Sequence, residues 1–418
     1  MRALLLAGLA VALAPATGAA AQDDLRDRVT RTDDKVLAGR VQNPFAPDEL
    51  VLLQGGKRVR VPRAEVAALD LLADRVREFA DRRVRLRGST KAQWFLVEWA
   101  RTHELPALAQ LQATWLALQH DLDAAHEFLG HERGAKGWLW PHDGKKLLRA
   151  QFDEALARAP LTLVGERFTL RCDANPVAAA AALLDLEQLG AVWLQRFGAA
   201  LQLREVLRPI DVVVHGSPDA FPKWGFRPLP FYEPPPHRDV ALTFWAGPLP
   251  QRPQRLFFVG TQGLLYRTLI GEADRGSDRD RVSAWLEIGF GMVMEHALQG
   301  DAGFAAPAEP RREDLQALTA LGRDYRLTHL LQLPMYGSFY LTDDTATAVN
   351  WSAATMFVTW LLQPDNDPPT RAKFLGYVRD ALGAKKGAGS SLFDDAMGCR
   401  IEDLDEPWRR WLAARAGY

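Results

Sequence analysis

Cysteine is scarce in this 418-residue chain, which contains only Cys172 and Cys399. Two cysteines so far apart form no disulfide framework, and neither belongs to a Cys-x-x-Cys pair of the kind that holds zinc or exchanges disulfides. One disulfide between them and two buried free thiols are equally compatible with the sequence. The cysteines therefore exclude a disulfide scaffold and a zinc knuckle.

The chain also lacks an excess of charge of one sign, since Lys plus Arg total 51 and Asp plus Glu total 52. The most basic run, residues 81–87, alternates arginine with apolar or acidic residues, which is typical of a solvated face. Because electrostatic binding of nucleic acid or membranes requires a basic surface, we expect no nucleic-acid partner. The G-x-S-x-G, P-loop and G-x-G-x-x-G signatures are absent as well.

Residues 1–21 have the organisation of a secretory signal peptide. Arg2 supplies the charged start, Ala3 to Leu13 form an apolar core too short to span a bilayer, and Ala19 to Ala21 form a small-residue cleavage site. An ordinary buried N-terminal helix is the alternative. The sequence predicts an exported protein, periplasmic or extracellular, with no membrane span.

The stretch HEFLGH at residues 126–131 comes close to a zinc-peptidase signature. Such a helix requires H-E-x-x-H, because ligands at i and i+4 lie about 40° apart on one face. Here the histidines lie at i and i+5, about 140° apart, so an unbroken helix cannot direct both toward one ion. We interpret the stretch as a helix end with Gly130 as its cap, and it predicts no metal site.

Three patterns divide the rest of the chain. Residues 34–68 contain three short strand patterns with hairpin punctuation, so we expect a small β module that packs on the helical segment after it. Residues 69–149 contain paired short helical patterns and resemble a tetratricopeptide-like segment. Residues 150–418 alternate strand and helix patterns.

In this last part the expected long helix begins with Asn175 as N-cap and Pro176 at the first helical position, and it ends at Gly198. The Pro-rich stretch 221–237 is expected to be irregular. The expected strands are residues 166–173, residues 209–216, ALTFWAG and RLFFVG.

This order of elements resembles the peptidase MA-like domain, that is, the gluzincin zinc peptidases related in fold to thermolysin. The similarity covers residues 150–418 and implies an α+β fold, a mostly helical domain with a small mixed sheet. It rests on Leu186-Glu187 in the long helix, IDVVVHGSPDAF as strand and tip, TFWAG as the glycine segment, and the C-terminal segments FYLTDDTATAVNWSAATMFVTWLL and SLFDDAMGCRIEDLDEPWRRWL.

In that family, two histidines on one helix, a glutamate beside the first and a third ligand from a second helix bind and use zinc. By the resemblance, Gln262 and Tyr266 take the histidine positions and Gly263 takes that of the general base. The third ligand position falls on Ile288, one residue after Glu287. Because these residues neither bind zinc usefully nor act as a base, the chain resembles a pseudo-peptidase without metal, cofactor or catalytic residues.

The leading hypothesis is an exported, non-catalytic protein whose peptidase-like cleft binds a protein, a peptide or a glycan. Loop aromatics are better binding candidates than aromatics in regular elements, for which core packing is the alternative. The candidate cleft residues are Trp224, Tyr232, Trp245 and Glu287.

Two alternatives remain open. One is an active zinc peptidase with ligands elsewhere, and the histidines available to it are His215, His237, His296 and His329. The other is a structural remnant with a filled cleft, in which Tyr266 and Ile288 pack against each other. An open groove lined by exposed aromatics would favour binding, and a collapsed one would favour a remnant.

Overall fold

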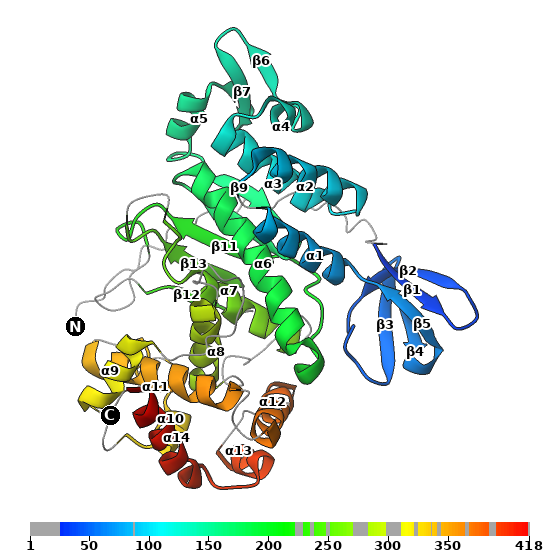
Figure 1. Ribbon diagram of the computed structural model, residues 1–418. Coiled ribbons are helices and arrows are strands. Elements are labelled where there is room, and N and C mark those ends of the chain that lie inside the picture. Colours follow the sequence, from blue (N-terminus) through cyan, green and yellow to red (C-terminus); the bar gives the residue numbers. More distant parts are fainter. Residues whose placement is uncertain are drawn as a thin grey trace, which may run out of the picture. The chain divides into compact units, whose positions relative to one another are not determined.

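The computed structural model describes residues 26–86, 88–221, 229–234, 238–247, 251–270, 283–297, 311–321, 325–335, 337–340, 344–363, 368–383 and 390–416. The expected signal peptide lies outside these residues. The fold is mixed α and β, 55% helical and 20% strand, with small sheets (Figure 1). The chain divides into two compact units, the first ending at Leu71 and lacking residues 43–47, which belong to the second.

The first unit contains one five-stranded antiparallel sheet in the order β4-β3-β2-β1-β5. The sequence predicts only three strands here, so β1 and β5 are additional. Their sequences, DRVTR and VAALD, carry weak strand signals, and it is pairing with each other that makes them strands. The strands are β1 (Asp27–Arg31), β2 (Val36–Val41), β3 (Glu49–Gln54), β4 (Lys57–Pro62) and β5 (Val66–Asp70).

The second unit begins with short helices, as expected. Pro106 starts one of them and Asp121, in the left-handed region at φ 48°, ends it. The prediction of a helical segment to residue 149 is wrong beyond α4, because a three-stranded sheet comes next. The elements are α1 (Leu72–Arg85), α2 (Thr90–Thr102), α3 (Pro106–His120), α4 (Asp123–Phe128), β6 (Glu132–Gly134), β7 (Gly137–His142), β8 (Lys145–Leu147) and α5 (Arg149–Ala155).

A second five-stranded sheet, in the order β12-β13-β11-β10-β9, lies at the centre of the remaining chain. Its inner strands β10 (Phe168–Cys172), β11 (Ile210–His215) and β13 (Val240–Phe244) are parallel and confirm three of the predicted strands. Both edge strands, β9 (Leu161–Val164) and β12 (Phe231–Glu233), run antiparallel to their neighbours. The stretch 221–237 is therefore not wholly irregular, since an edge strand tolerates nearby prolines.

The predicted long helix is α6 (Pro176–Leu201). The Asn175 side chain accepts hydrogen bonds from the backbone N–H groups of Val177 and Ala178, which confirms the predicted N-cap. The helix does not end at Gly198 but continues to Leu201, where Gln202 adopts φ 51°. Among the described residues α6 is the one helix long and apolar enough to cross a membrane, and 83% of its most apolar window is buried, as in a core helix.

RLFFVG is helical, so its prediction as a strand is wrong. Short apolar runs do not distinguish a buried strand from a buried helix. Here helix α7 (Leu256–Leu265) is capped by Glu295 of α8 (Ala284–Ala297), whose carboxylate accepts the backbone N–H groups of Phe257 and Phe258 at 2.9 and 3.0 Å. These bonds satisfy donors that a helix N-terminus leaves open.

Helix α8 packs closely on the C-terminal helices, which gather around it in yellow, orange and red (Figure 1). A Cβ on Gly289 would lie 2.4 Å from Val358 Cγ2 and 2.8 Å from the Ala354 carbonyl oxygen. Both cysteines are free. The C-terminal helices are α9 (Arg312–Leu321), α10 (Leu327–Gln332), α11 (Asp344–Leu362), α12 (Pro368–Gly383), α13 (Ser390–Met397) and α14 (Ile401–Ala416).

We expect Gly289→Ala to lower the free energy of unfolding by about 1–3 kcal/mol, because the added methyl group overpacks the crossing of α8 and α11. Denaturant unfolding followed by circular dichroism measures this change. Gly376→Ala in α12 is the matched control, since a Cβ there meets no atom within 4 Å. The control is expected to be neutral or to stabilise by up to about 1 kcal/mol. Equal destabilisation by both substitutions would contradict the close crossing.

Candidate functional site

Two side chains of the predicted site converge on one buried carboxylate. Nε2 of Gln262 donates to Oε1 of Glu287 at 2.8 Å, and the hydroxyl of Tyr266 donates to Oε2 of Glu287 at 3.3 Å. Oε1 of Gln262 accepts the backbone N–H of Tyr232 at 3.1 Å. We call Tyr232, Gln262, Tyr266 and Glu287 the central polar cluster. It joins helix α7, helix α8 and edge strand β12.

The backbone explains why Gln262 and Tyr266 point the same way. They lie four residues apart, so their side chains share one face of α7. At Tyr266 the helix changes to a π-helical turn, Tyr266–Ile270, a rare geometry that is frequent at functional sites. Thr268 in this turn accepts a hydrogen bond from the Trp193 indole at 3.1 Å, which ties the turn to α6.

The central polar cluster is closed to solvent, since its four side chains belong to residues that are between 1% and 5% exposed. Tyr232 and Tyr266 also pack ring against ring, with centroids 5.3 Å apart. Trp245, another candidate cleft residue, is buried, and its indole donates to the backbone carbonyl of Gln251 at 2.7 Å. Trp224 lies outside the described residues. At the residues that the structure describes, the expected cleft is therefore filled.

Glu287 faces α7, because its carboxylate accepts hydrogen bonds from Gln262 and Tyr266. Ile288, the next residue, points about 100° away around the helix. The carboxylate that meets Gln262 and Tyr266 therefore belongs to Glu287, the residue before the position that the resemblance gives to the third ligand. The sequence alone could have indicated this, because a glutamate stands directly before Ile288.

Gly263 leaves no room for a larger side chain. A Cβ there would lie 2.9 Å from Ile210 Cγ2 and 3.5 Å from the Tyr232 ring. A larger residue at this position would require the Ile210 side chain to shift. The volume in which a general base would stand is filled by apolar side chains.

An ion pair next to the cluster holds the hydroxyl group of Tyr232 in place. Its hydroxyl donates to Asp239, and Arg267, which follows Tyr266, forms an ion pair with the same carboxylate. Burial raises the pKa of the Tyr232 hydroxyl, and the charge of Arg267 opposes that shift. Tyr232 therefore stays protonated at ordinary pH and acts as a hydrogen-bond donor.

The three histidines of the alternative hypothesis that the structure describes form no metal-binding group. Burial lowers the pKa of His215, at the end of β11, and lowers that of His296, on α8, to about 3. His329 is exposed on α10, and His237 lies outside the described residues. Within the described ranges, no group of three His, Cys, Asp or Glu side chains is placed to hold a metal ion. Glu295, next to His296, caps α7, and the His296 side chain is only 7% exposed.

Comparisons with models of known protein families, with curated proteins and with solved structures found no match to this chain. The interpretation of the central polar cluster therefore depends on its own geometry and chemistry.

We expect Gln262→Leu to lower the free energy of unfolding by about 2–4 kcal/mol, because it removes the partner of the Tyr232 N–H and one donor to a buried carboxylate. Denaturant unfolding measures the change. Thr261→Val, next to it and equally buried, is the control. Its hydroxyl donates only to the Phe257 carbonyl within α7, so the expected loss is within about 1 kcal/mol. A Gln262→Leu protein as stable as the control would show that the amide does not hold the site together.

Proposed function

We propose that this protein is an exported, non-catalytic relative of the gluzincin zinc peptidases, in which a hydrogen-bonded cluster stands in place of the zinc site. The observation that carries the proposal is the Gln262 amide, which bonds Glu287 on one side and the backbone of β12 on the other. The resemblance implies a particular arrangement of zinc ligands: two residues at i and i+4 on one helix and a carboxylate from the next helix. Gln262, Tyr266 and Glu287 have this arrangement.

The side chains at this site do not fit zinc. Catalytic zinc takes three protein ligands from histidine, cysteine and carboxylate side chains, and here only Glu287 belongs to that set. An amide and a phenol are poor ligands for the ion. Gly263 supplies no base to activate a water molecule, and its surroundings exclude one. Loss of ligands and of base together supports loss of hydrolysis.

The same replacements explain how the fold survives without metal. A buried carboxylate is costly unless it is hydrogen-bonded, and Gln262 and Tyr266 each provide a donor to Glu287. The carbonyl oxygen of the same amide accepts a hydrogen bond from the backbone N–H of Tyr232 in β12. Hydrogen bonds thus connect the elements that line the site.

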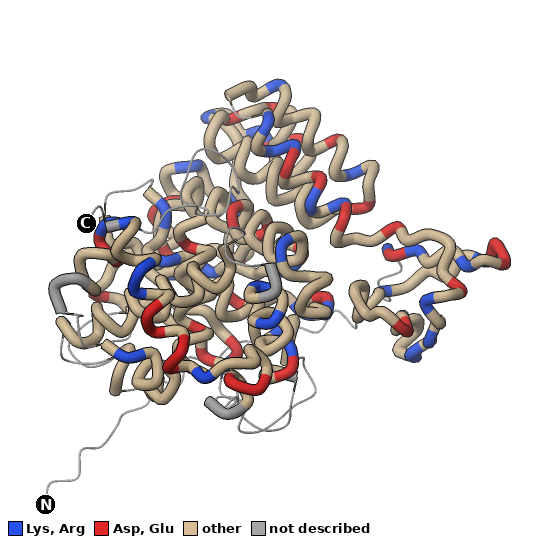
Figure 2. Tube along the Cα trace, turned by 60° about the horizontal axis from the view of Figure 1, so that its bottom comes forward, with Lys and Arg blue, Asp and Glu red and all other residues tan. Residues whose placement is uncertain are grey.

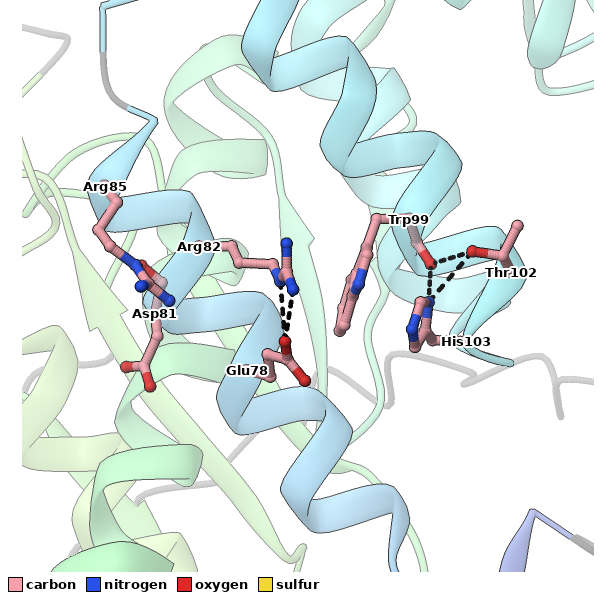
Figure 3. Close-up of polar contacts among 7 residues, drawn as sticks. All are labelled: Glu78, Asp81, Arg82, Arg85, Trp99, Thr102 and His103. Carbon is pink, nitrogen blue, oxygen red and sulfur yellow. Dashed lines mark hydrogen bonds and ion pairs between the residues drawn. The ribbon is translucent and has the colours of Figure 1, made fainter.

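The closed cluster bears on the choice between a binding protein and a remnant. A filled cleft favours the remnant for this site, so a partner that is a protein, a peptide or a glycan would bind elsewhere on the chain. A face of α1 and α2 is a surface at which such a partner would bind. There the ring of Trp99 lies between the Arg82 guanidinium, 4.8 Å away, and the His103 ring, 4.1 Å away (Figure 3). Phe95 on α2 is 60% exposed.

The charge of Arg82 on that face is already paired, which argues against a polyanionic partner. Glu78 accepts two hydrogen bonds from Arg82, from Nε at 3.0 Å and from Nη2 at 2.6 Å (Figure 3). Figure 2 shows basic and acidic residues interspersed along the described chain. The arrangement supports a partner that is recognised by apolar and hydrogen-bonding groups rather than by nucleic-acid phosphates.

Metal analysis tests the proposal. Mature protein purified without a histidine tag, from cells supplied with zinc, is expected to hold well under one zinc per chain and to gain none when the ion is added back. One tightly held zinc per chain would overturn the proposal. Substitution of the histidines in turn would then locate the ligands.

A gain-of-metal variant tests the correspondence with the gluzincin site. The double substitution Gln262→His with Tyr266→His creates three ligands with Glu287 and is expected to bind about one zinc per chain. Adding Glu287→Gln as a matched control should abolish this binding. Peptidase activity is not expected, because Gly263 still provides no base. A folded double variant that binds no zinc would contradict the correspondence while leaving the non-catalytic interpretation intact.

A further inference from the structure

The HEFLGH stretch does end a helix, as predicted, but its cap brings the two histidines together. Gly130 adopts φ 70°, and its N–H donates to the Glu127 carbonyl at 3.1 Å. The N–H of His131 donates back to the His126 carbonyl at 2.9 Å. These two bonds define a Schellman cap, in which the residue after the glycine contacts the helix residue five positions earlier.

The paired histidines form a hydrogen-bonded chain with Asp121, the residue that ends α3. Nε2 of His126 lies 3.0 Å from Oδ1 of Asp121, and Nδ1 of His126 lies 2.8 Å from Nδ1 of His131. Since a carboxylate only accepts, His126 donates its Nε2–H to Asp121, which leaves its Nδ1 as an acceptor. His131 must then donate its Nδ1–H.

Aromatic side chains of β7 enclose this pair. The His126 ring, whose side chain is fully buried, stacks on Trp138 with centroids 4.8 Å apart and planes at 5°. Trp140 lies against both imidazoles, 5.1 Å from His126 and 4.6 Å from His131. The Trp138 indole donates to Asp123 on α4 at 2.8 Å. The neutral imidazole pair is therefore part of the contact between α4 and the sheet β6–β7–β8.

The charged groups around the two histidines do not offset the free-energy cost of protonating a buried imidazole. Asp121, from α3, has a side chain that is 82% exposed, so water screens it. On α4, Asp123 is shared by Trp138 and by Arg133 of β6, and on α5 Arg149 adds a positive charge 5.6 Å from the Trp140 ring. Glu132 of β6 pairs with Lys146 of β8.

The pKa values follow from this environment. Burial lowers the pKa of His126, and burial together with the His126 charge lowers that of His131 to about 4. Both pKa values lie below the ordinary histidine value of about 6.5. Between about pH 6.5 and 4, the state in which the sheet has separated from α4 therefore binds protons more readily than the packed state. The contact between α4 and the β6–β7–β8 sheet is thus at its most stable above about pH 6.5, and this stability is lost as the pH falls toward 4. A second proton would also place N–H against N–H at the 2.8 Å contact.

We propose that Asp121, His126 and His131 form an acid-sensitive latch, which holds the β6–β7–β8 sheet on α4 at neutral pH and releases it in mild acid. Release would expose Trp138 and Trp140, so the latch would couple the acidity of the surrounding medium to an aromatic surface. The proposal uses no residue of the central polar cluster and is independent of the function proposed above.

Hydrogen exchange read by mass spectrometry, corrected for the intrinsic pH dependence of exchange, tests the latch on the full mature chain. Between pH 7.5 and 4.5, peptides from residues 132–147 are expected to lose protection by about tenfold or more, whereas peptides from α3 keep theirs. Unchanged protection of residues 132–147 would overturn the proposal. Simultaneous loss in α3 would overturn it too, because that result means general unfolding.

Two variants separate a titrating latch from plain packing. His131→Gln keeps an N–H donor but cannot titrate, so its acid-induced loss of β6–β8 protection is expected to be smaller than in the unmodified chain, and only the part due to His126 remains. His103→Gln, on α2, is the matched control and should retain the acid response. An acid response in His131→Gln as large as that of the unmodified chain would overturn the proposal. If His131→Gln loosens the sheet at every pH, NMR titration of isotope-labelled histidines in the unmodified chain decides: a pKa of His131 near 4 supports the latch, and an ordinary value refutes it.

Discussion

A carboxylate buried in the centre of a protein must be met by hydrogen-bond donors, and the packing of α7, α8 and β12 depends on how Glu287 meets that requirement. One donor comes from an amide on α7 and the other from a phenol at the start of the π-helical turn that follows it. The amide carries a carbonyl oxygen as well, so it can also hold the backbone of β12. A histidine bound to a metal would fix the helices in another way, through coordination. In this chain neutral side chains make the connection without requiring an ion.

The same use of acidic side chains recurs elsewhere in the second unit. Glu295 of α8 caps the start of α7, and Asp405 of α14 accepts the backbone N–H of Leu327 at the start of α10. Glu187 of α6 accepts the N–H groups of Arg167 and Phe168 at the start of β10. Burial raises the pKa of Glu187 to about 7, against the opposing charge of Arg167. In each case a carboxylate from one helix decides where a neighbouring element begins.

The sequence by itself determined the elements whose signals are local. Asn175 and Pro176 specify the start of α6, apolar runs specify the inner strands of the central sheet, and Gly130 specifies the end of α4. Each of these features depends on residue type and spacing within a few residues, which the sequence preserves. Gln262, Gly263 and Tyr266, in contrast, were singled out only by the resemblance to the gluzincin peptidases.

Only the tertiary structure decided what depends on distant partners. RLFFVG is a helix whose first N–H groups bond to the distant Glu295, and β1 and β5 pair with each other. Whether Glu287 or Ile288 faces α7 depends on the rotation of α8, where one residue changes the direction by about 100°. Whether the cleft is open depends on how β12 and α8 close over α7, and Ile210 and Tyr232 fill the volume beside Gly263. Local sequence carries no record of such distances, so these features appear only when the chain is packed.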